Sequence, residues 1–180
     1  MRTVFNKKKC FTLLSTTLLM SAMTAHAAKS DSATITISGV VQDTTCQFNT
    51  DIYTTTLDSV ADTAFKAVGE TMSIKEVPVS FTCGSDSTGV KISVAGEVNQ
   101  DGTDTTAFKN FGGSTGIALR LLASNGSTVL KPSGTSSTSK ITLDSNHTGT
   151  YTFKAGYVKT ADVITPGSFT SVVSLSFNYN

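Results

Sequence analysis

The sequence predicts an all-β protein, a sandwich of antiparallel sheets, and two observations carry this prediction. The first is composition: the 180 residues contain no Trp and only 3 Pro, while Ser, Thr, Val, Ile and Gly are abundant, which favours strands and turns. The second is a period of two, because apolar and polar residues alternate in run after run. Such alternation is typical of strands that bury one face in a core.

Six segments carry the alternation and are separated by turn-forming residues. The predicted strands cover residues 33–41, 77–83, 90–94, 117–121, 151–157 and 173–179. Asn125-Gly126 predicts a two-residue hairpin turn after the fourth of these. Residues 133–139, a low-complexity run of Ser, Thr and Gly, are expected to form a surface loop, and residues 60–68 a single helical turn. This spacing of short strands and turns favours a sandwich.

The first 27 residues predict a secretory signal peptide. Basic residues at positions 2 and 7–9 precede an apolar run, and Ala25-His26-Ala27 follows as a signal-peptidase site. The apolar run is shorter than the ~20 residues that span a bilayer, so we expect no membrane insertion of the mature chain. Cleavage leaves 10 Lys and Arg against 13 Asp and Glu, a net charge of −3. This mild acidity gives no reason to expect a nucleic-acid partner.

Cleavage also removes Cys10 and leaves two cysteines, Cys46 and Cys83. An even pair in an exported chain predicts one disulfide. The other interpretations have less support, because a metal site needs more ligands than two Cys and one distant His147. A redox site usually has the spacing Cys-x-x-Cys.

Catalytic patterns are missing from the sequence. The mature chain has one histidine, His147, in a stretch typical of a turn, and its carboxylates are scattered singly. We find no phosphate-binding glycine loop, EF-hand loop or Cys/His cluster. The sequence therefore predicts a protein that is not an enzyme and needs no cofactor or metal.

The two ends and the cysteine pair resemble the subunits of chaperone–usher fimbriae, especially those of type 1-like fimbriae. Residues 32–41 followed by Cys46 resemble the N-terminal region of that family, and Phe81-Thr82-Cys83-Gly84 resembles the strand that carries its second cysteine. Gly167, fourteenth from the C-terminus, and the penultimate Tyr179 are similar to the family's C-terminal signature.

This resemblance implies an incomplete immunoglobulin-like β-sandwich that is completed by a donor strand from another chain. It divides the chain into a signal peptide (1–27), an N-terminal donor-strand extension (28–41) and a pilin β-sandwich domain (42–180). The donor residues expected to face a neighbour's groove are Ala33, Ile35, Ile37, Gly39 and Val41. The C-terminal residues expected to form a groove wall and contact a chaperone are Gly167, Val173, Leu175, Phe177 and Tyr179.

The implied function is that of a structural subunit of a surface fimbria that contributes to cell adhesion. The implied partners are other fimbrial subunits, a periplasmic chaperone and an outer-membrane usher, and the implied location is the cell surface, reached through the periplasm. The alternative is a self-complete exported β-sandwich that binds carbohydrate, against which the absence of Trp argues weakly. The length leaves no room for a two-domain tip adhesin. The short stretch before residue 33 favours a minor adaptor over a major shaft subunit.

Overall fold

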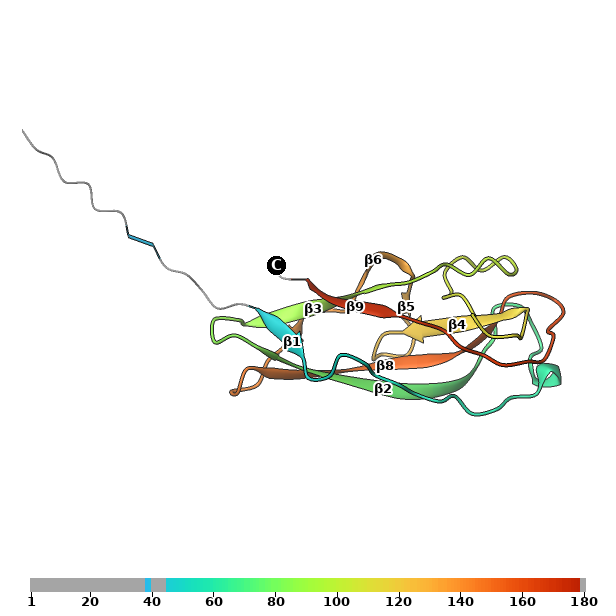
Figure 1. Cartoon of the computed structure of the whole chain (residues 1–180), viewed down its shortest axis with the longest axis horizontal. Coiled ribbons are helices and arrows are strands. Elements are labelled where there is room, and N and C mark those ends of the chain that lie inside the picture. The colour runs from blue at the N-terminus through green and yellow to red at the C-terminus, as the bar shows by residue number, and fades with distance from the viewer. Residues whose placement is uncertain (1–37, 40–44, 179–180) are drawn as a thin grey trace, which may run out of the picture. The chain divides into compact units, whose positions relative to one another are not determined.

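The computed structural model describes residues 38–39 and 45–178, and the second range forms a β-sandwich (Figure 1). Its elements in chain order are β1 (Cys46–Phe48), η1 (Asp62–Ala64), β2 (Thr71–Cys83), β3 (Gly89–Ala95), β4 (Ile117–Leu122), β5 (Val129–Leu130), β6 (Ser133–Ser137), β7 (Ile141–Thr142), β8 (Thr148–Lys159) and β9 (Ser174–Asn178). The predicted helical turn is present as the 3-10 helix η1.

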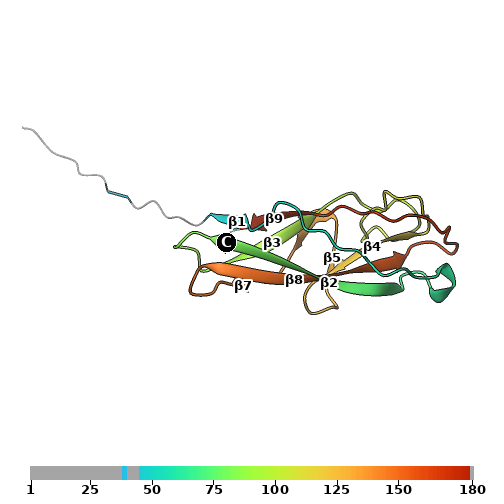
Figure 2. The same cartoon turned by 60° about the horizontal axis from the view of Figure 1, so that its bottom comes forward.

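The strands form two antiparallel sheets that pack face to face (Figures 1 and 2). The larger sheet has the order β1-β2-β8-β4-β5, with β1 at one edge. In the smaller sheet β3 is central, β6 and β7 follow one another along one of its edges, and β9 pairs with the other edge. Within the described residues, β1 and β9 are therefore edge strands of opposite sheets.

The core lies between the sheets and is built by the alternating residues. Phe81, Ile92 and Phe153 are almost fully buried, and their sequence neighbours point away from the core. The strands predicted over 77–83, 90–94, 117–121 and 151–157 are confirmed, although β2 starts earlier than expected. That extension contains a bulge at Ser73, whose φ of 54° lies in the left-handed region.

One side of the sandwich is closed by backbone pairing between the sheets. Val98, just after β3, pairs with Phe108, and Phe108 pairs in turn with Leu119 of β4. Phe108 donates its N–H to the carbonyl of Leu119 and accepts from the same residue, both at 2.9 Å. The chain from β3 to β4 thus joins the two sheets on this side.

Two local predictions are corrected by the structure. Residues 133–137 form strand β6 instead of a surface loop, because the edge of β3 pairs with any extended backbone and the Ser and Thr side chains only made the segment look like a loop. The Asn125 hairpin is present but its loop is longer than two residues. Ala123 donates to the carbonyl of Thr128, and the Asn125 side chain accepts from the backbone N–H groups of Ser127 and Thr128.

Strand β4 is buried on both faces, whereas its alternation predicted one solvent-facing side. Its outer face is covered by the loop before it, where Arg120 of β4 forms an ion pair with Asp104 and donates to the hydroxyl of Thr106 at 2.7 Å. Burial opposes ionisation of Asp104, but hydrogen bonds from Thr106 and the charge of Arg120 outweigh it and lower the pKa of the carboxyl.

We expect Asp104→Asn to weaken folding by roughly 1.5–3 kcal/mol at neutral pH, because it removes the charge from a buried hydrogen-bonded pair. The folded-state pKa of Asp104 is depressed, so its contribution is present above the unfolded value of about 3.9 and is lost as pH falls through the folded value. Urea unfolding at pH 7 and pH 3 measures this. The difference in stability between the variant and the wild-type chain should be smaller at pH 3 than at pH 7; an equal difference at both pH values would contradict the prediction.

Candidate functional site: an apolar groove between two sheet edges

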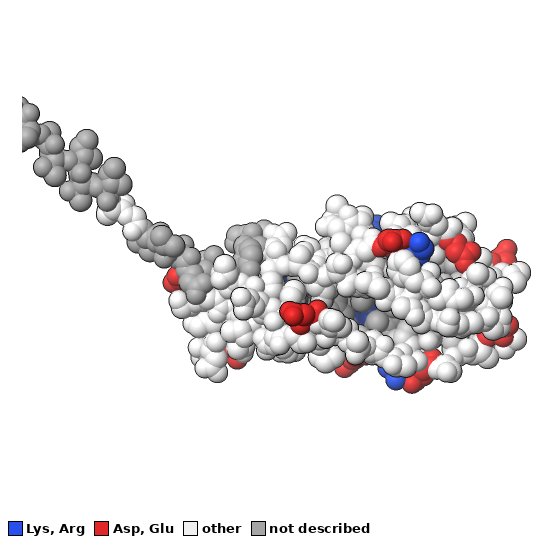
Figure 3. All heavy atoms as spheres, in the orientation of Figure 1, with Lys and Arg blue, Asp and Glu red and all other residues white. Residues whose placement is uncertain are grey.

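A groove runs between the edge of the larger sheet at β1 and the edge of the smaller sheet at β9. One wall is β1 with the extended chain that follows it to η1, and the other is residues 164–178, which include β9. In Figure 3 the molecule is hollowed between these two segments, and the surface around the hollow is mostly uncharged.

The first wall is attached to the sandwich by hydrogen bonds and an ion pair on the side that faces β2. The phenol of Tyr53 donates to the carbonyl of Ser80 at 2.6 Å, and the backbone N–H of Asn49 donates to the same carbonyl at 2.9 Å. Farther along, Asp58 pairs with Lys75 at 2.7 Å, and its carbonyl accepts from the hydroxyl of Ser73. These contacts fix the wall in place, and its other side faces the groove.

The second wall is likewise attached along one side. β9 pairs with β3, and the chain before it is tied to the loop over residues 110–115. Phe111 donates to the carbonyl of Thr170 at 2.7 Å, and Ser114 donates to that of Ser168 at 3.0 Å. Within the described residues, β9 pairs with no strand on its groove side.

Gly167 is required for the close approach of these two segments. A Cβ on Gly167 would lie 2.7 Å from the backbone nitrogen of Ser114, too close for any other residue without a shift. Gly112 is packed equally closely against Ser168, because a Cβ on Gly112 would lie 2.2 Å from the carbonyl oxygen of Ser168. The glycine pair lets the wall lie flat against the loop.

The floor and walls of the groove enclose four adjoining cavities. The largest, about 620 Å³, lies between Phe48 to Thr54 and Ser171 to Leu175. Beneath it a pocket of about 110 Å³ reaches Val79, Leu121 and Phe153 of the core. A third of about 390 Å³ follows beside Leu57 and Phe169, and an end cavity of about 300 Å³ reaches Phe65 and Gly167.

The apolar residues of both walls are only half-buried, unlike those of the other strands. Side chains of β3 such as Ile92 and Val94 are 0% exposed, whereas the wall residues pack on the core with one side open. These half-buried residues are Phe48, Tyr53, Leu57, Phe169, Val173, Leu175 and Phe177. The core is thus incomplete along one line, and its apolar surface there is accessible.

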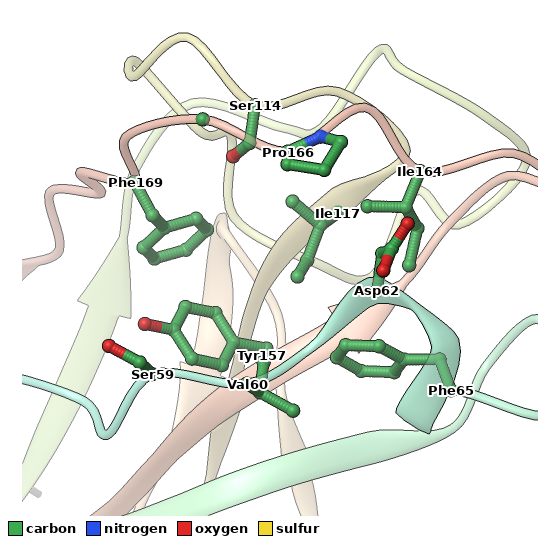
Figure 4. Close-up of a pocket in the computed structure, with 11 residues that line it drawn as sticks. Ser59, Val60, Asp62, Phe65, Ser114, Ile117, Tyr157, Ile164, Pro166 and Phe169 are labelled. Atoms are coloured by element: carbon green, nitrogen blue, oxygen red, sulfur yellow. The ribbon is translucent and has the colours of Figure 1, made fainter.

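Aromatic pairs shape the two ends of the groove. At one end Phe48 of β1 and Phe177 of β9 stack with their centroids 4.1 Å apart. Toward the other end, Tyr157 and Phe169 meet edge to face at 4.8 Å. Figure 4 shows these two rings together on one side of the end cavity, opposite Phe65 and Ile164.

Hydroxyl side chains line the groove beside its apolar residues, among them Thr54, Thr170, Ser171 and Tyr157. Burial raises the pKa of Tyr157 above its ordinary value, and the nearby charge of Asp58 adds to this, opposed by Lys75. The hydroxyl of Ser171, which lines two of the cavities, is buried and makes no hydrogen bond within the described part of the chain. An inserted backbone could supply its partner.

The predicted C-terminal residues are distributed along one wall. Val173 and Leu175 line the deep pocket, Gly167 lines the end cavity, and Phe177 stacks on Phe48. Tyr179 lies outside the described residues. Their contact with a chaperone remains a prediction.

The predicted donor residues Ala33, Ile35, Ile37 and Val41 also lie outside the described residues, as does the predicted signal peptide. Gly39 is described with Ser38, and both are exposed and belong to no strand. The disulfide is confirmed: Cys46 and Cys83 are directly opposed in the β1–β2 ladder and are bonded.

The sequence did not predict the first wall or the aromatic pair at the end cavity. Tyr53, Leu57 and Val60 are spaced by four and three residues, which is not a strand pattern, and Tyr53 is held by its hydrogen bond to the carbonyl of Ser80 in β2. Phe169, however, falls on the same face as Val173, Leu175 and Phe177 when their alternation is extended toward the N-terminus, so the pattern could have predicted it.

Other kinds of site find no support in the part of the chain that the structure describes. There, no group of three or more Cys, His, Asp or Glu could hold a metal, and no helix is long and apolar enough to cross a membrane. His147 lies in the predicted turn, where Asp144 accepts from the backbone of Asn146 and Thr148. Hydrogen bonds from Thr148 lower the pKa of Asp144, and the carbonyl of His147 accepts from the N–H of Cys83 at 2.9 Å, so this turn has a structural role.

Solved structures similar to this chain are pilus proteins. An antigen and type I fimbria protein of Burkholderia pseudomallei is 20% identical over 78% of this chain and 97% of its own, with a TM-score of 0.57. A subunit in a chaperone–usher pilus is 17% identical over 83% and 96%, with a TM-score of 0.59. The P pilus rod subunit PapA is 16% identical over 75% and 99%, with a TM-score of 0.60. No curated protein matches the sequence.

These likenesses define the fold as the immunoglobulin-like sandwich of pilus subunits. The family is defined by the sequence itself, because the model of the family described as fimbrial protein matches residues 35–180. The chain belongs to the fimbrial protein family and is a structural subunit of a pilus.

Proposed function

We propose that this subunit assembles by strand insertion: the groove accepts an extended strand from another polypeptide, and the arm over residues 33–41 fills the groove of a neighbouring subunit. The observation that carries the proposal is the line of half-buried apolar residues between β1 and β9. An added strand would pair with the groove side of β9 and cover these apolar residues. Such strand addition is called β-augmentation, and the complexes of chaperones with pilins are a known example.

The arm has the chemistry that such a groove requires. Ala33, Ile35, Ile37 and Val41 share one face of an extended strand, and Gly39 falls on the same face where close approach is needed. Burying Ile35, Ile37 and Val41 would contribute roughly 5–9 kcal/mol at about 1.5–3 kcal/mol each, before ordering costs. This is enough for a stable contact between subunits.

An uncovered groove of this kind is an aggregation hazard, so the subunit needs a partner that covers the groove during export. A periplasmic chaperone would fill the groove with a strand of its own, contacting Val173, Leu175, Phe177 and Tyr179, and an outer-membrane usher would exchange it for the arm of the next subunit. The signal peptide over 1–27 supports export through the periplasm, and the finished fimbria would stand on the cell surface and contribute to adhesion. The role is structural and not enzymatic.

Addition of a peptide covering residues 31–43 should raise the thermal midpoint of the exported chain. At a hundredfold excess over its Kd, the peptide stabilises the fold by roughly 2.7 kcal/mol, which is roughly 5–10 °C for a domain of this size. A peptide with Ile35→Asp and Ile37→Asp serves as the control and should have little effect. If neither peptide changes the midpoint, or both change it equally, strand insertion is wrong.

A further inference from the structure

We propose that this subunit binds a neutral sugar residue in a cavity of about 370 Å³ beside the chain that joins β3 to β4. Three features of this polar cavity carry the inference: a rigid frame, side-chain groups that the fold leaves without partners, and an exposed aromatic ring next to it. The site is separate from the groove and does not depend on strand insertion. It would give the subunit a part in adhesion beyond its structural role.

The polar cavity lies on the other side of residues 114–117 from the end cavity of the groove. Ser114 and Ile117 line both cavities, and Figure 4 shows these two residues from the groove side. The other residues that line the polar cavity come from 99–101, 109–112 and Thr115, and none of them lines a cavity of the groove. A strand inserted in the groove would therefore leave the polar cavity open.

Side-chain hydrogen bonds hold the walls of the polar cavity. The amide of Asn99, a residue that is 3% exposed, donates to the carbonyl of Asp101 at 2.7 Å. One carboxylate oxygen of Asp101 accepts from the backbone N–H of Gly116, which ties the two walls together. On the opposite wall the amide of Asn110 donates to the carbonyl of Ser114 at 2.8 Å. A frame that is fixed before binding has little entropy to lose when a ligand enters.

Three side chains of the cavity have groups left for a ligand. Gln100 and Thr115 are exposed, and their side chains make no hydrogen bond within residues 45–178. Asp101 uses one carboxylate oxygen for the frame, and its second oxygen has no partner in that range. An amide and a hydroxyl both donate and accept, whereas a carboxylate only accepts. This set matches neighbouring hydroxyl groups of a sugar, each of which donates and accepts.

Phe111 provides an apolar surface next to these polar groups. The residue is 46% exposed and lies between Asn110 and Gly112, which both line the cavity. Lys109 also lines the cavity, and its Nζ lies 4.9 Å from the centroid of the Phe111 ring. A pyranose ring has hydroxyl groups at its edge and an apolar C–H face, so it can stack on an aromatic ring while its hydroxyls reach polar side chains. Phe111 thus takes the place of the Trp that the sequence lacks.

The charges at the cavity favour a neutral sugar over an anionic ligand. Lys109 is paired with Glu97 at 2.8 Å, whereas Asp101 has no ion-pair partner in the described part of the chain. A ligand with a phosphate, sulfate or carboxylate group would meet the charge of Asp101 without a free cation to offset it. The volume lies within the range of about 300–1,000 Å³ that is typical of small-molecule sites.

Saturation-transfer NMR with the full exported chain tests the proposal, because it observes the sugar and works with monomers and fibres alike. The probes are the methyl glycosides of galactose, mannose and N-acetylglucosamine, with sialic acid as the anionic control. We expect at least one neutral glycoside to bind with a Kd on the order of 1 mM, and sialic acid not to bind at roughly 20 mM. The proposal is overturned if no neutral glycoside binds at roughly 20 mM, or if sialic acid binds more tightly than all of them.

Two variants test whether the sugar lies in this cavity. Gln100→Ala and Phe111→Ala should each weaken binding roughly five- to tenfold, because one removes hydrogen bonds and the other the stacking surface, and neither side chain belongs to the frame. Val163→Ala is the matched control, since Val163 is 75% exposed and lines neither the groove nor the polar cavity. Equal affinity in all three variants would place the sugar elsewhere and overturn the site.

The peptide covering residues 31–43 separates this proposal from strand insertion. The sugar and the peptide should bind at the same time, because the polar cavity stays open when the groove is filled. Displacement of the sugar by the peptide would place the sugar in the groove and overturn the proposed site. A chain that binds the sugar and ignores the peptide would contradict strand insertion and support the polar cavity as an independent site.

Discussion

A chain with Ile37→Asp should keep its fold but lose the ability to donate its arm, so that fibres no longer grow from it. Ile37 belongs to the predicted apolar face of the arm and is not one of the residues 45–178 that form the sandwich, so its replacement leaves the groove residues unchanged. Inserting the variant arm would forfeit about 1.5–3 kcal/mol of burial and place an unpaired carboxylate among apolar groups, which costs several kcal/mol more. Together these predict a loss of affinity on the order of a thousandfold or more.

The reciprocal variant blocks the groove and leaves the arm intact. Thr54 is exposed at the mouth and lines two adjoining cavities, so Thr54→Trp would place an indole across the path of the strand with little effect on the core. Val173→Asp is a second groove variant, whose folding is checked by circular dichroism. Each variant alone should remain monomeric.

Mixing the two variants separates strand insertion from any general loss of association. A Thr54→Trp chain can donate and an Ile37→Asp chain can accept, so an equimolar mixture should form heterodimers and stop there. Analytical ultracentrifugation distinguishes monomers, dimers and fibres. Fibres from either variant alone would contradict the mechanism, and a mixture that remains entirely monomeric would show that one copy of the chain does not fill the groove of another.

The sequence predicts the parts of this fold that depend on the local alternation of apolar and polar residues. The period of two located β2, β3, β4 and β8 because each buries one face continuously, and the two cysteines of an exported chain left one obvious pairing. Strand β6 was missed because its pairing uses backbone groups, which a run of Ser and Thr does not reveal. The outer face of β4 was misjudged because Asp104, sixteen residues from Arg120, covers it only in three dimensions.

The groove shows more clearly that local sequence patterns do not reveal contacts between distant segments. Its β9 wall follows from the alternation of Val173, Leu175 and Phe177, but its other wall has no strand pattern and is held by Tyr53 and Asp58 through contacts with β2. The contact between the rings of Tyr157 and Phe169 exists because the fold brings two distant segments together. The donor arm and the C-terminal wall of the groove could be proposed from sequence because each is one segment with its own alternation; the other wall could not, because only the assembled sandwich places it beside β9.

Removal of the Cys46–Cys83 disulfide should destabilise the subunit by about 4 kcal/mol in the chain-entropy model, given the sequence separation of 37 residues. The bond has a second consequence, because Cys46 and Cys83 are directly opposed and β1 has only three residues to pair with β2. Without the bridge, the start of the first groove wall, including Phe48 and its stack on Phe177, would depend on the three-residue β1–β2 ladder and on hydrogen bonds such as that from Asn49 to Ser80.

The double variant Cys46→Ala/Cys83→Ala should therefore lose affinity for the residue 31–43 peptide as well as stability. Denaturant unfolding gives the stability difference, and peptide titration below the unfolding transition gives the affinity. The wild-type chain in reductant is the matched control, since it loses the same bond without any change of side-chain size at the two positions. An unchanged unfolding midpoint in both samples would remove the structural role of the bridge. A large loss of stability with full peptide affinity would show instead that the rest of the wall holds the groove open without β1.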